Sequence, residues 1–292
     1  MSAPRLDDSV FPAADALREE GWRTPEALLL LGTGLGTLPS SLAGERRLDL
    51  GELPGAPRIW AENALVAGKL GALEVWLIED APGELEFGEG GGPGRPAWER
   101  AWPTWLAAAA GAQLCVITAA GVTLGPRLGD GSGLAVGTLA ALSDHVNFSG
   151  TTPLLGLGET RLGPLFPDQS EVHHRGLRLR AVDRARTLGI PLSEAIAACL
   201  VGPSLATPAE LAWLARTGCG VAVQGLAGPL IAGAHAGLPA LVLVAITDSG
   251  EEPLRMAQLV DRAEACAPAL EDLVQALVPD LVEVARDLED EL

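Results

Sequence analysis

Residues 27–36 read ALLLLGTGLG. The unbroken apolar run 27–31 is followed by a turn of three glycines, one threonine and one leucine. Such a run predicts a buried strand that leads into a tight turn. At the edge of a parallel sheet, the backbone N–H groups of this turn and the Thr33 hydroxyl can cradle a small anion. A tight turn without a ligand is the alternative that this motif leaves open. A dinucleotide fingerprint needs a glycine three residues after Gly34, where Thr37 stands, so the turn is not of the Rossmann type.

Strands and helices alternate along the rest of the chain. Apolar runs predict strands at 73–78, 113–118, 134–142, 197–201, 220–223 and 241–247, and helical spacing predicts helices at 96–110, 171–188, 208–217 and 226–236. This alternation predicts a largely parallel sheet with helices on both faces. The acidic, glycine-rich stretch 84–95 predicts a surface loop, and 254–292 predicts one or two packed helices. Because no linker or repeat divides the chain, we expect residues 1–292 to form one α/β domain.

The composition excludes several classes of function. The 292 residues are 48% hydrophobic with 36 Gly and 22 Pro, as in an ordered globular protein. Tyrosine is absent and Lys69 is the only lysine, which excludes tyrosine acid–base chemistry and leaves no phosphate-loop lysine, because the residues around Lys69 do not fit that motif. A net charge of −18 repels phosphate backbones and anionic lipid. We therefore expect neither nucleic acid nor a membrane as a partner.

The cysteines and histidines point to structural roles. Cys115, Cys199, Cys219 and Cys266 stand singly among apolar or small residues, which predicts buried free thiols in a reducing compartment. The adjacent pair His173-His174 cannot present two imidazoles on one helix face, so we expect no metal site. The N-terminus carries charged residues and no apolar segment of a secretory signal. The cytoplasm is the expected location.

A set of further motifs follows the glycine turn in a fixed order. They are Thr118-Ala119-Ala120-Gly121, Asp144-His145-Val146-Asn147, Thr152-Pro153-Leu154, Phe166-Pro167-Asp168, Gly202-Pro203-Ser204-Leu205-Ala206-Thr207-Pro208-Ala209-Glu210 and Ile246-Thr247-Asp248. In order and spacing, this set resembles the trimeric class of purine nucleoside phosphorylases and the related methylthioadenosine phosphorylases. The resemblance covers roughly residues 24–248, and its specificity lies in the whole set.

The resemblance implies a fold and a reaction. The fold would be a single α/β domain with a mixed, mostly parallel sheet, a partly barrel-like centre and flanking helices. The reaction would be the phosphate-dependent cleavage of the N-glycosidic bond of a purine nucleoside in purine salvage, with phosphate as co-substrate and no cofactor. The bond breaks through an oxocarbenium-like state, so the site must hold phosphate near the sugar and stabilise charge on the purine. A cytoplasmic homotrimer would follow from the same likeness.

At the phosphate site that the resemblance implies, two positions of this chain match the family and two others carry the opposite charge. Thr33 and Thr118 take the places of phosphate-binding hydroxyl groups, and we expect the two hydroxyls to converge at one edge of the sheet. The family's glycine-arginine-x-histidine motif aligns with residues 83–86, so that Glu84 and Glu86 stand where an arginine and a histidine are usual. Two carboxylates thus replace cationic groups, which makes the site divergent.

For the nucleoside, the resemblance assigns a further group of positions. The expected substrate contacts are Ala119, Leu205, Ala206, Gln224, Gly225, Thr247 and Asp248. Asp248 stands where the nucleoside phosphorylases have asparagine, and we assign it the catalytic role at the base. An ionised carboxylate accepts from an exocyclic amine or a protonated N7, so Asp248 favours a 6-aminopurine.

The remaining matched residues have simpler explanations. Thr207 and Glu210 fit a capping box at a helix start, and His235 lies in an apolar helical stretch where a structural histidine is usual. Asp144 and His145 follow a predicted strand, where they would hold a loop. Two alternatives to phosphorolysis stay open: a nucleoside-binding homologue that has lost its phosphate site, and a hydrolase in which Glu84 or Glu86 activates water.

The carboxylates at the family's arginine and histidine positions lead to a first prediction. If Glu84 and Glu86 occupy the family's arginine and histidine positions, phosphate binding at neutral pH is weak, because the dianion faces carboxylates. The double change Glu84→Arg and Glu86→His is then expected to raise phosphate affinity, about tenfold for each 1.4 kcal/mol recovered. Calorimetric titration with phosphate measures this, and micromolar binding by the unmodified chain contradicts the prediction.

Overall fold

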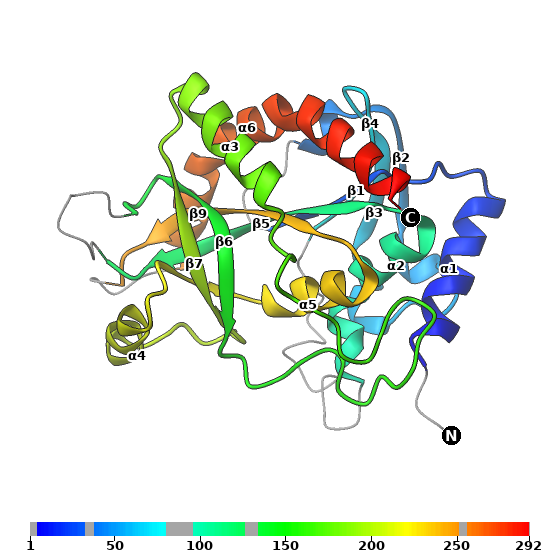
Figure 1. Ribbon diagram of the computed structural model, residues 1–292, viewed down its shortest axis with the longest axis horizontal. Helices are drawn as coiled ribbons and strands as arrows, with labels where there is room; N and C mark the ends of the chain where they lie inside the picture. The colour runs from blue at the N-terminus through cyan, green and yellow to red at the C-terminus, as the bar shows by residue number, and fades with distance from the viewer. Residues whose placement is uncertain (1–4, 33–37, 80–95, 126–133, 251–255, 292) are drawn as a thin grey trace.

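In the part of the chain that the structure describes, a nine-stranded sheet and six α-helices organise the fold (Figure 1). The computed structural model describes residues 5–32, 38–79, 96–125, 134–250 and 256–291. The strands are β1 (Ala27–Leu31), β2 (Ala43–Asp49), β3 (Ala64–Leu70), β4 (Leu73–Glu79), β5 (Leu114–Thr123), β6 (Leu139–Asn147), β7 (Leu192–Leu200), β8 (Val221–Gln224) and β9 (Ala240–Asp248). The helices are α1 (Asp7–Glu19), α2 (Trp102–Ala110), α3 (Arg175–Leu188), α4 (Pro208–Leu214), α5 (Ala227–Ala236) and α6 (Met256–Asp290).

The sheet is mixed and closes on itself at one end. Its strand order is β2-β3-β4-β1-β5-β8-β7-β6-β9, and β5 also pairs with β9. The last five strands therefore form a ring, the barrel-like centre that the resemblance implied. Pairs such as β1–β5 and β6–β7 are parallel, whereas β5–β8 and β6–β9 are antiparallel. The expected mixed α/β architecture is confirmed.

Two apolar cores explain the continuous run 27–31. Leu28 and Leu30 pack with α1, α2 and α5 on one face of the sheet. Ala27, Leu29 and Leu31 pack with α3 and α6 on the other face. Because successive side chains of a strand point to opposite faces, a strand covered on both sides must be apolar at every position. Figure 1 shows α6 and α5 on opposite sides of the sheet.

The structure differs from the predicted elements at several places. Residues 7–19, 43–49 and 64–70 form α1, β2 and β3, none of which we expected. β2 is exposed or half-buried along its length and reads AGERRLD, so it carries no apolar alternation. β6 lies five residues later than predicted, because its pairing with β7 extends through the polar residues up to Asn147. At the C-terminus, where we expected one or two helices, the structure has one, α6, which continues through Pro268 and Pro279.

The expected state of the cysteines is confirmed. All four thiols are free and buried. Burial raises the pKa of Cys115 and of Cys199 to about 12, which keeps both thiols protonated and unreactive. Among the described residues, no helix combines the length and the apolar character needed to cross a bilayer.

A buried histidine ties two helices to the loop that follows β6. The indole N–H of Trp105 in α2 donates to Nδ1 of His235 in α5 at 3.1 Å. Nδ1 is therefore the acceptor, so Nε2 carries the proton and donates to the Thr160 hydroxyl at 3.1 Å. Burial lowers the pKa of His235. The expected structural role of His235 is confirmed by these two bonds.

This network generates a prediction about pH. A histidine with a lowered pKa stays neutral in the folded chain, while the unfolded chain takes up a proton below about pH 6.5, so its contribution to stability is lost as pH falls. In His235→Asn, the amide oxygen replaces Nδ1 as acceptor and does not titrate. We expect this variant to lose about 1 kcal/mol at pH 7 with the Thr160 bond, but to lose less stability than the natural chain between pH 7 and 5. Urea unfolding at both pH values measures this, and equal losses in the two proteins contradict it.

Candidate functional site at the neighbour exchange of β5

Strand β5 changes its neighbour on one edge at Ala119. Up to Thr118 this edge pairs with β1, in which Leu31 lies opposite Thr118. From Gly121 the same edge pairs with β8, in which Val223 lies opposite Gly121. Ala119 and Ala120 fall between the two partners and are half-buried. In open α/β sheets, ligands bind where neighbouring strands part in this way.

The end of β1 is locked to this point by a glycine. The Gly32 N–H donates to the Thr118 carbonyl at 2.9 Å and to the Thr118 hydroxyl at 3.0 Å. A methyl group on Gly32 would overlap the Thr118 carbonyl oxygen, so only glycine allows this approach. Because the hydroxyl oxygen accepts from Gly32, its own proton remains to be donated. Thr118 can thus offer a hydrogen bond to an anion at the sheet edge.

Several predicted positions fall outside the described residues. These are Thr33, Glu84 and Glu86, so the expected convergence of the Thr33 and Thr118 hydroxyls and the reversal at Glu84 and Glu86 stay predictions. The segments that contain them, 33–37 and 80–95, follow β1 and β4. The segments 126–133 and 251–255 come shortly after β5 and β9.

The end of β9 reaches the same region from the other edge of β5. Asp248 lies opposite Val122, and the register shifts between Gly121 and Val122. Thr247 is buried and donates from its hydroxyl to the Gly121 carbonyl at 3.4 Å. The Thr247 hydroxyl proton is thus already donated within the barrel wall. The expected contact of Thr247 with substrate stays a prediction.

Asp248 is held by a residue that the sequence motifs did not reveal. Its side chain is only 11% exposed, and the carboxylate lies 3.3 Å from Nη1 of Arg262 in α6. The same Nη1 donates to the Thr247 carbonyl at 3.0 Å. Arg262 thus orients the carboxylate and compensates its charge. No motif marks this arginine, because its partner lies 14 residues away across a segment with no periodic pattern.

The expected sugar and base contacts lie near the end of β8. The Gln224 amide donates to the Ser204 carbonyl at 2.8 Å, which joins β8 to the segment before α4. That segment also carries Leu205, which is exposed, and Ala206, which is half-buried. Gly225 has φ +74°, a conformation that favours glycine. The structure therefore brings these four predicted positions into one neighbourhood.

The strand register gives the distance between the two ends of the candidate site, Thr118 and Asp248. Thr118 and Val122 are four residues apart on β5, about 13 Å at 3.3 Å per residue. Gly32 lies beside the first and Asp248 opposite the second. A phosphate group and a nucleoside in line fit such a span. The arrangement can therefore present a hydroxyl donor at one end and a charge-compensated carboxylate at the other.

Two other predicted roles are confirmed in part. Glu210 is a helix cap: its backbone N–H donates to the Thr207 hydroxyl at 3.3 Å, and its carboxylate accepts from the Thr207 N–H at 2.7 Å. Asp144 and His145, which we expected after a strand, lie inside β6 instead. The His145 ring nevertheless contacts the loop before α3, through His173 at 3.1 Å.

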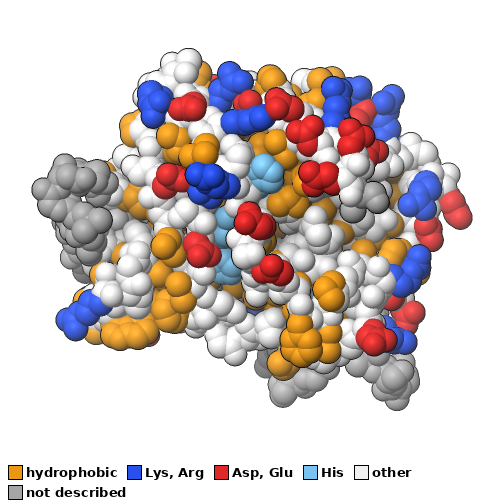
Figure 2. Space-filling view, viewed as in Figure 1, with side chains coloured by type: hydrophobic (Ala, Val, Ile, Leu, Met, Phe, Trp, Pro, Cys, Tyr) orange, Lys and Arg blue, Asp and Glu red, His pale blue; other side chains and the backbone are white. Residues whose placement is uncertain are grey.

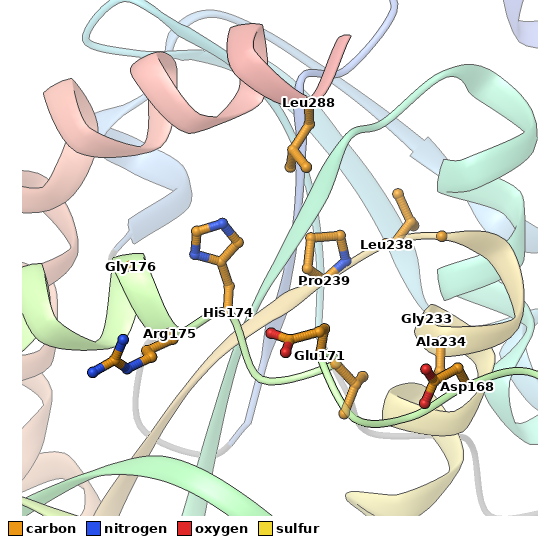
Figure 3. Close-up of a pocket in the computed structure, with 12 residues that line it drawn as sticks. Asp168, Glu171, His174, Arg175, Gly176, Gly233, Ala234, Leu238, Pro239 and Leu288 are labelled. Carbon is orange, nitrogen blue, oxygen red and sulfur yellow. The ribbon is translucent and has the colours of Figure 1, made fainter. Parts of the chain in front are cut away.

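A pocket of about 390 Å³ lies at the opposite end of β9 (Figure 3). Asp168, Glu171, His174, Pro239 and Leu288 are among its lining residues. It begins just before β9, whereas Asp248 ends that strand, about 26 Å further on at 3.3 Å per residue. His174 is already used there as the cap of α3, accepting from the Leu177 N–H at 3.0 Å. This pocket is separate from the predicted nucleoside site.

Comparison with known proteins identifies the family. The model of the phosphorylase superfamily matches residues 29–279, which include the last three residues of β1 and all of β5 and β9, as well as Arg262. The chain belongs to the phosphorylase superfamily. Among curated relatives, purine nucleoside phosphorylase 1 of Bacillus subtilis is 28% identical over 279 residues, 94% of this chain and 98% of the relative. The purine nucleoside phosphorylase of Bos taurus is 28% identical over 224 residues, 73% of this chain and 72% of the relative.

Solved structures share the fold of this superfamily member. A purine nucleoside phosphorylase of Schistosoma mansoni in complex with inosine has a TM-score of 0.79 and 19% identity, covering 97% of this chain and 98% of that chain. The same organism's enzyme in complex with adenosine has a TM-score of 0.77 and 21% identity, covering 93% of this chain and 95% of that one. The chain therefore has the fold of a purine nucleoside phosphorylase over nearly its whole length.

Proposed function

We propose that this chain is a purine nucleoside phosphorylase, which transfers the pentosyl group of a purine nucleoside to phosphate without a cofactor. The observation that supports the proposal is the exchange of neighbours on β5 next to Thr118, with Asp248 opposite Val122 further along the same strand. The superfamily membership and the relatives at 28% identity support the same reaction. The cytoplasm suits four free, buried thiols.

In the proposed reaction, a phosphate oxygen attacks the anomeric carbon as the bond to the purine nitrogen breaks. Thr33 and Thr118 would donate hydrogen bonds to phosphate, with Ala119 beside the sugar. Gln224 and Gly225 would line the sugar, and Leu205 and Ala206 the base. Asp248 would accept a hydrogen bond from the departing purine, from a 6-amino group or a protonated N7. Arg262 would hold that carboxylate in place.

The reversed residues Glu84 and Glu86 favour a second candidate, a homologue with the same fold but without phosphate activation, or with water as the acceptor. The products separate the three possibilities. Phosphorolysis releases free base and pentose 1-phosphate only when phosphate is present. Hydrolysis releases free base and pentose without phosphate. A binding protein releases neither but is saturated by nucleoside in calorimetry.

The central prediction concerns Asp248 and the choice of base. With phosphate present, we expect the natural chain to release adenine from adenosine faster than hypoxanthine from inosine. An asparagine can donate to a 6-oxo group, so Asp248→Asn is expected to move the ratio of kcat/KM values toward inosine by roughly tenfold or more. Chromatographic assay of the free bases measures both rates.

A matched control keeps this prediction specific. Asp49→Asn removes an exposed carboxylate from β2, at the far edge of the sheet, and is expected to leave the ratio unchanged. An unchanged ratio in Asp248→Asn contradicts the role of Asp248 at the base. Absence of base release from either nucleoside contradicts the phosphorylase itself.

We also propose that the chain assembles as a homotrimer, as its resemblance to the trimeric class implies. Its exposed apolar side chains support this: Phe166 is 89% exposed and Leu155 69% exposed, both in the loop between β6 and α3. Three chains of 30.0 kDa give about 90 kDa. Light scattering at micromolar concentration is expected to give this mass, and Phe166→Asp is expected to lower it. A monomeric mass for the natural chain contradicts the trimer.

A further inference from the structure

Three potential metal ligands meet near the start of β9, at the opposite end of that strand from Asp248. Asp144 and His145 belong to β6, and His173 lies just before α3. Nδ1 of His145 is 3.1 Å from Nε2 of His173, and the ligand atoms of all three side chains lie within 4.8 Å of one another. From the sequence we expected no metal site, because the neighbours His173 and His174 could not share one. The structure instead pairs His173 with a histidine 28 residues away.

The backbone explains why these side chains converge. The pairing of β6 with β7 shifts between Leu142 and Asp144, an irregularity of the kind that redirects side chains. His173 forms an isolated bridge with Ala240, the first residue of β9. Because β6 runs antiparallel to β9, this bridge brings His173 to the part of β6 that carries His145. Asp248, by contrast, ends β9.

The chemistry of the three side chains suits the binding of a cation better than it suits the contact that they make with one another without one. Each of the two imidazoles has a ring nitrogen that can offer a lone pair to a metal ion, and the carboxylate of Asp144 adds oxygen ligands. His173 is 6% exposed, and its Nδ1 is buried without a hydrogen-bond partner among the described residues. The His145–His173 bond alone therefore leaves a buried polar atom of His173 unsatisfied. Figure 2 shows histidine side chains set among acidic ones on this face.

The geometry of the two nitrogens is compatible with one ion. At metal–nitrogen distances of about 2.0–2.1 Å, two nitrogens 3.1 Å apart subtend roughly 100° at the metal, close to a tetrahedral angle. A carboxylate oxygen of Asp144 supplies a third ligand after a small side-chain rotation, which its exposure permits. Water completes the coordination. Two imidazoles and one carboxylate favour zinc and its neighbours over calcium or magnesium.

We propose that Asp144, His145 and His173 form a binding site for a divalent cation of the zinc class, which clamps β6 to the segment before α3. The site does not rest on the proposed phosphorylase activity, because none of its three ligands is among the residues assigned to that reaction. Its effect is structural: the ion fixes the loop between β6 and α3 at its C-terminal end. That loop carries the exposed Leu155 and Phe166.

Calorimetric titration of the full chain with zinc chloride, in a buffer free of phosphate and chelators, tests the proposal. We expect one ion per chain and a rise in the thermal midpoint on saturation. His145→Gln and His173→Gln are each expected to weaken zinc binding at least tenfold and to abolish the rise. His145 is half-buried, so His145→Gln keeps the test valid even if His173→Gln does not fold.

The neighbouring histidine gives the matched control. His174→Asn retains a residue that can cap α3 and leaves the three proposed ligands in place, so zinc binding is expected to persist. Binding that is lost in His174→Asn but kept in His145→Gln would assign the ion to the pocket beside Glu171 and overturn the proposal. Absence of zinc binding to the natural chain, or equal affinity in His145→Gln, overturns it as well.

Discussion

The pairing of β5 is the constraint on which the rest of the structure depends. This strand has β9 along one edge and, in succession, β1 and β8 along the other. The pairing with β8 closes the five-stranded ring, and the change from β1 to β8 leaves Ala119 and Ala120 between neighbours. Gly121 is closely packed there: an added methyl group would lie 2.6 Å from the Val221 side chain and 2.8 Å from that of Val244. Ring closure and site therefore share one glycine-dependent feature.

The two apolar cores hold this feature in place from both faces. α2 and α5 pack on one side and α3 and α6 on the other, so β1 and β5 cannot shift without disturbing both layers. The 35-residue helix α6 has a second effect, because the residues near its start place Arg262 beside Asp248. Packing that stabilises the fold thus also determines where a site carboxylate points. A rigid scaffold of this kind suits a reaction that depends on positioning.

How much the sequence could predict depends on whether a feature is local. The run 27–31 and the capping box at Thr207 were predictable, because apolar continuity and cap spacing are properties of neighbouring residues. β2 was not, because an exposed edge strand needs no apolar pattern. The pairs Arg262–Asp248 and His145–His173 were not either, since they join segments through tertiary contacts. Family motifs located Asp248, but only the fold shows what holds it.

The Asp248–Arg262 pair bears on how an acidic protein can act on an anionic co-substrate. With a net charge of −18, the chain repels phosphate at long range, and a lone carboxylate at the base would also oppose the charge that develops on a departing purine. Arg262 neutralises that carboxylate within the site, at 3.3 Å. The Thr118 hydroxyl, whose oxygen accepts from the Gly32 N–H, keeps a proton that it can donate to an anion. In the proposed reaction, charge compensation of Asp248 inside the site, rather than the charge of the whole surface, would decide whether the departing purine meets a net negative charge.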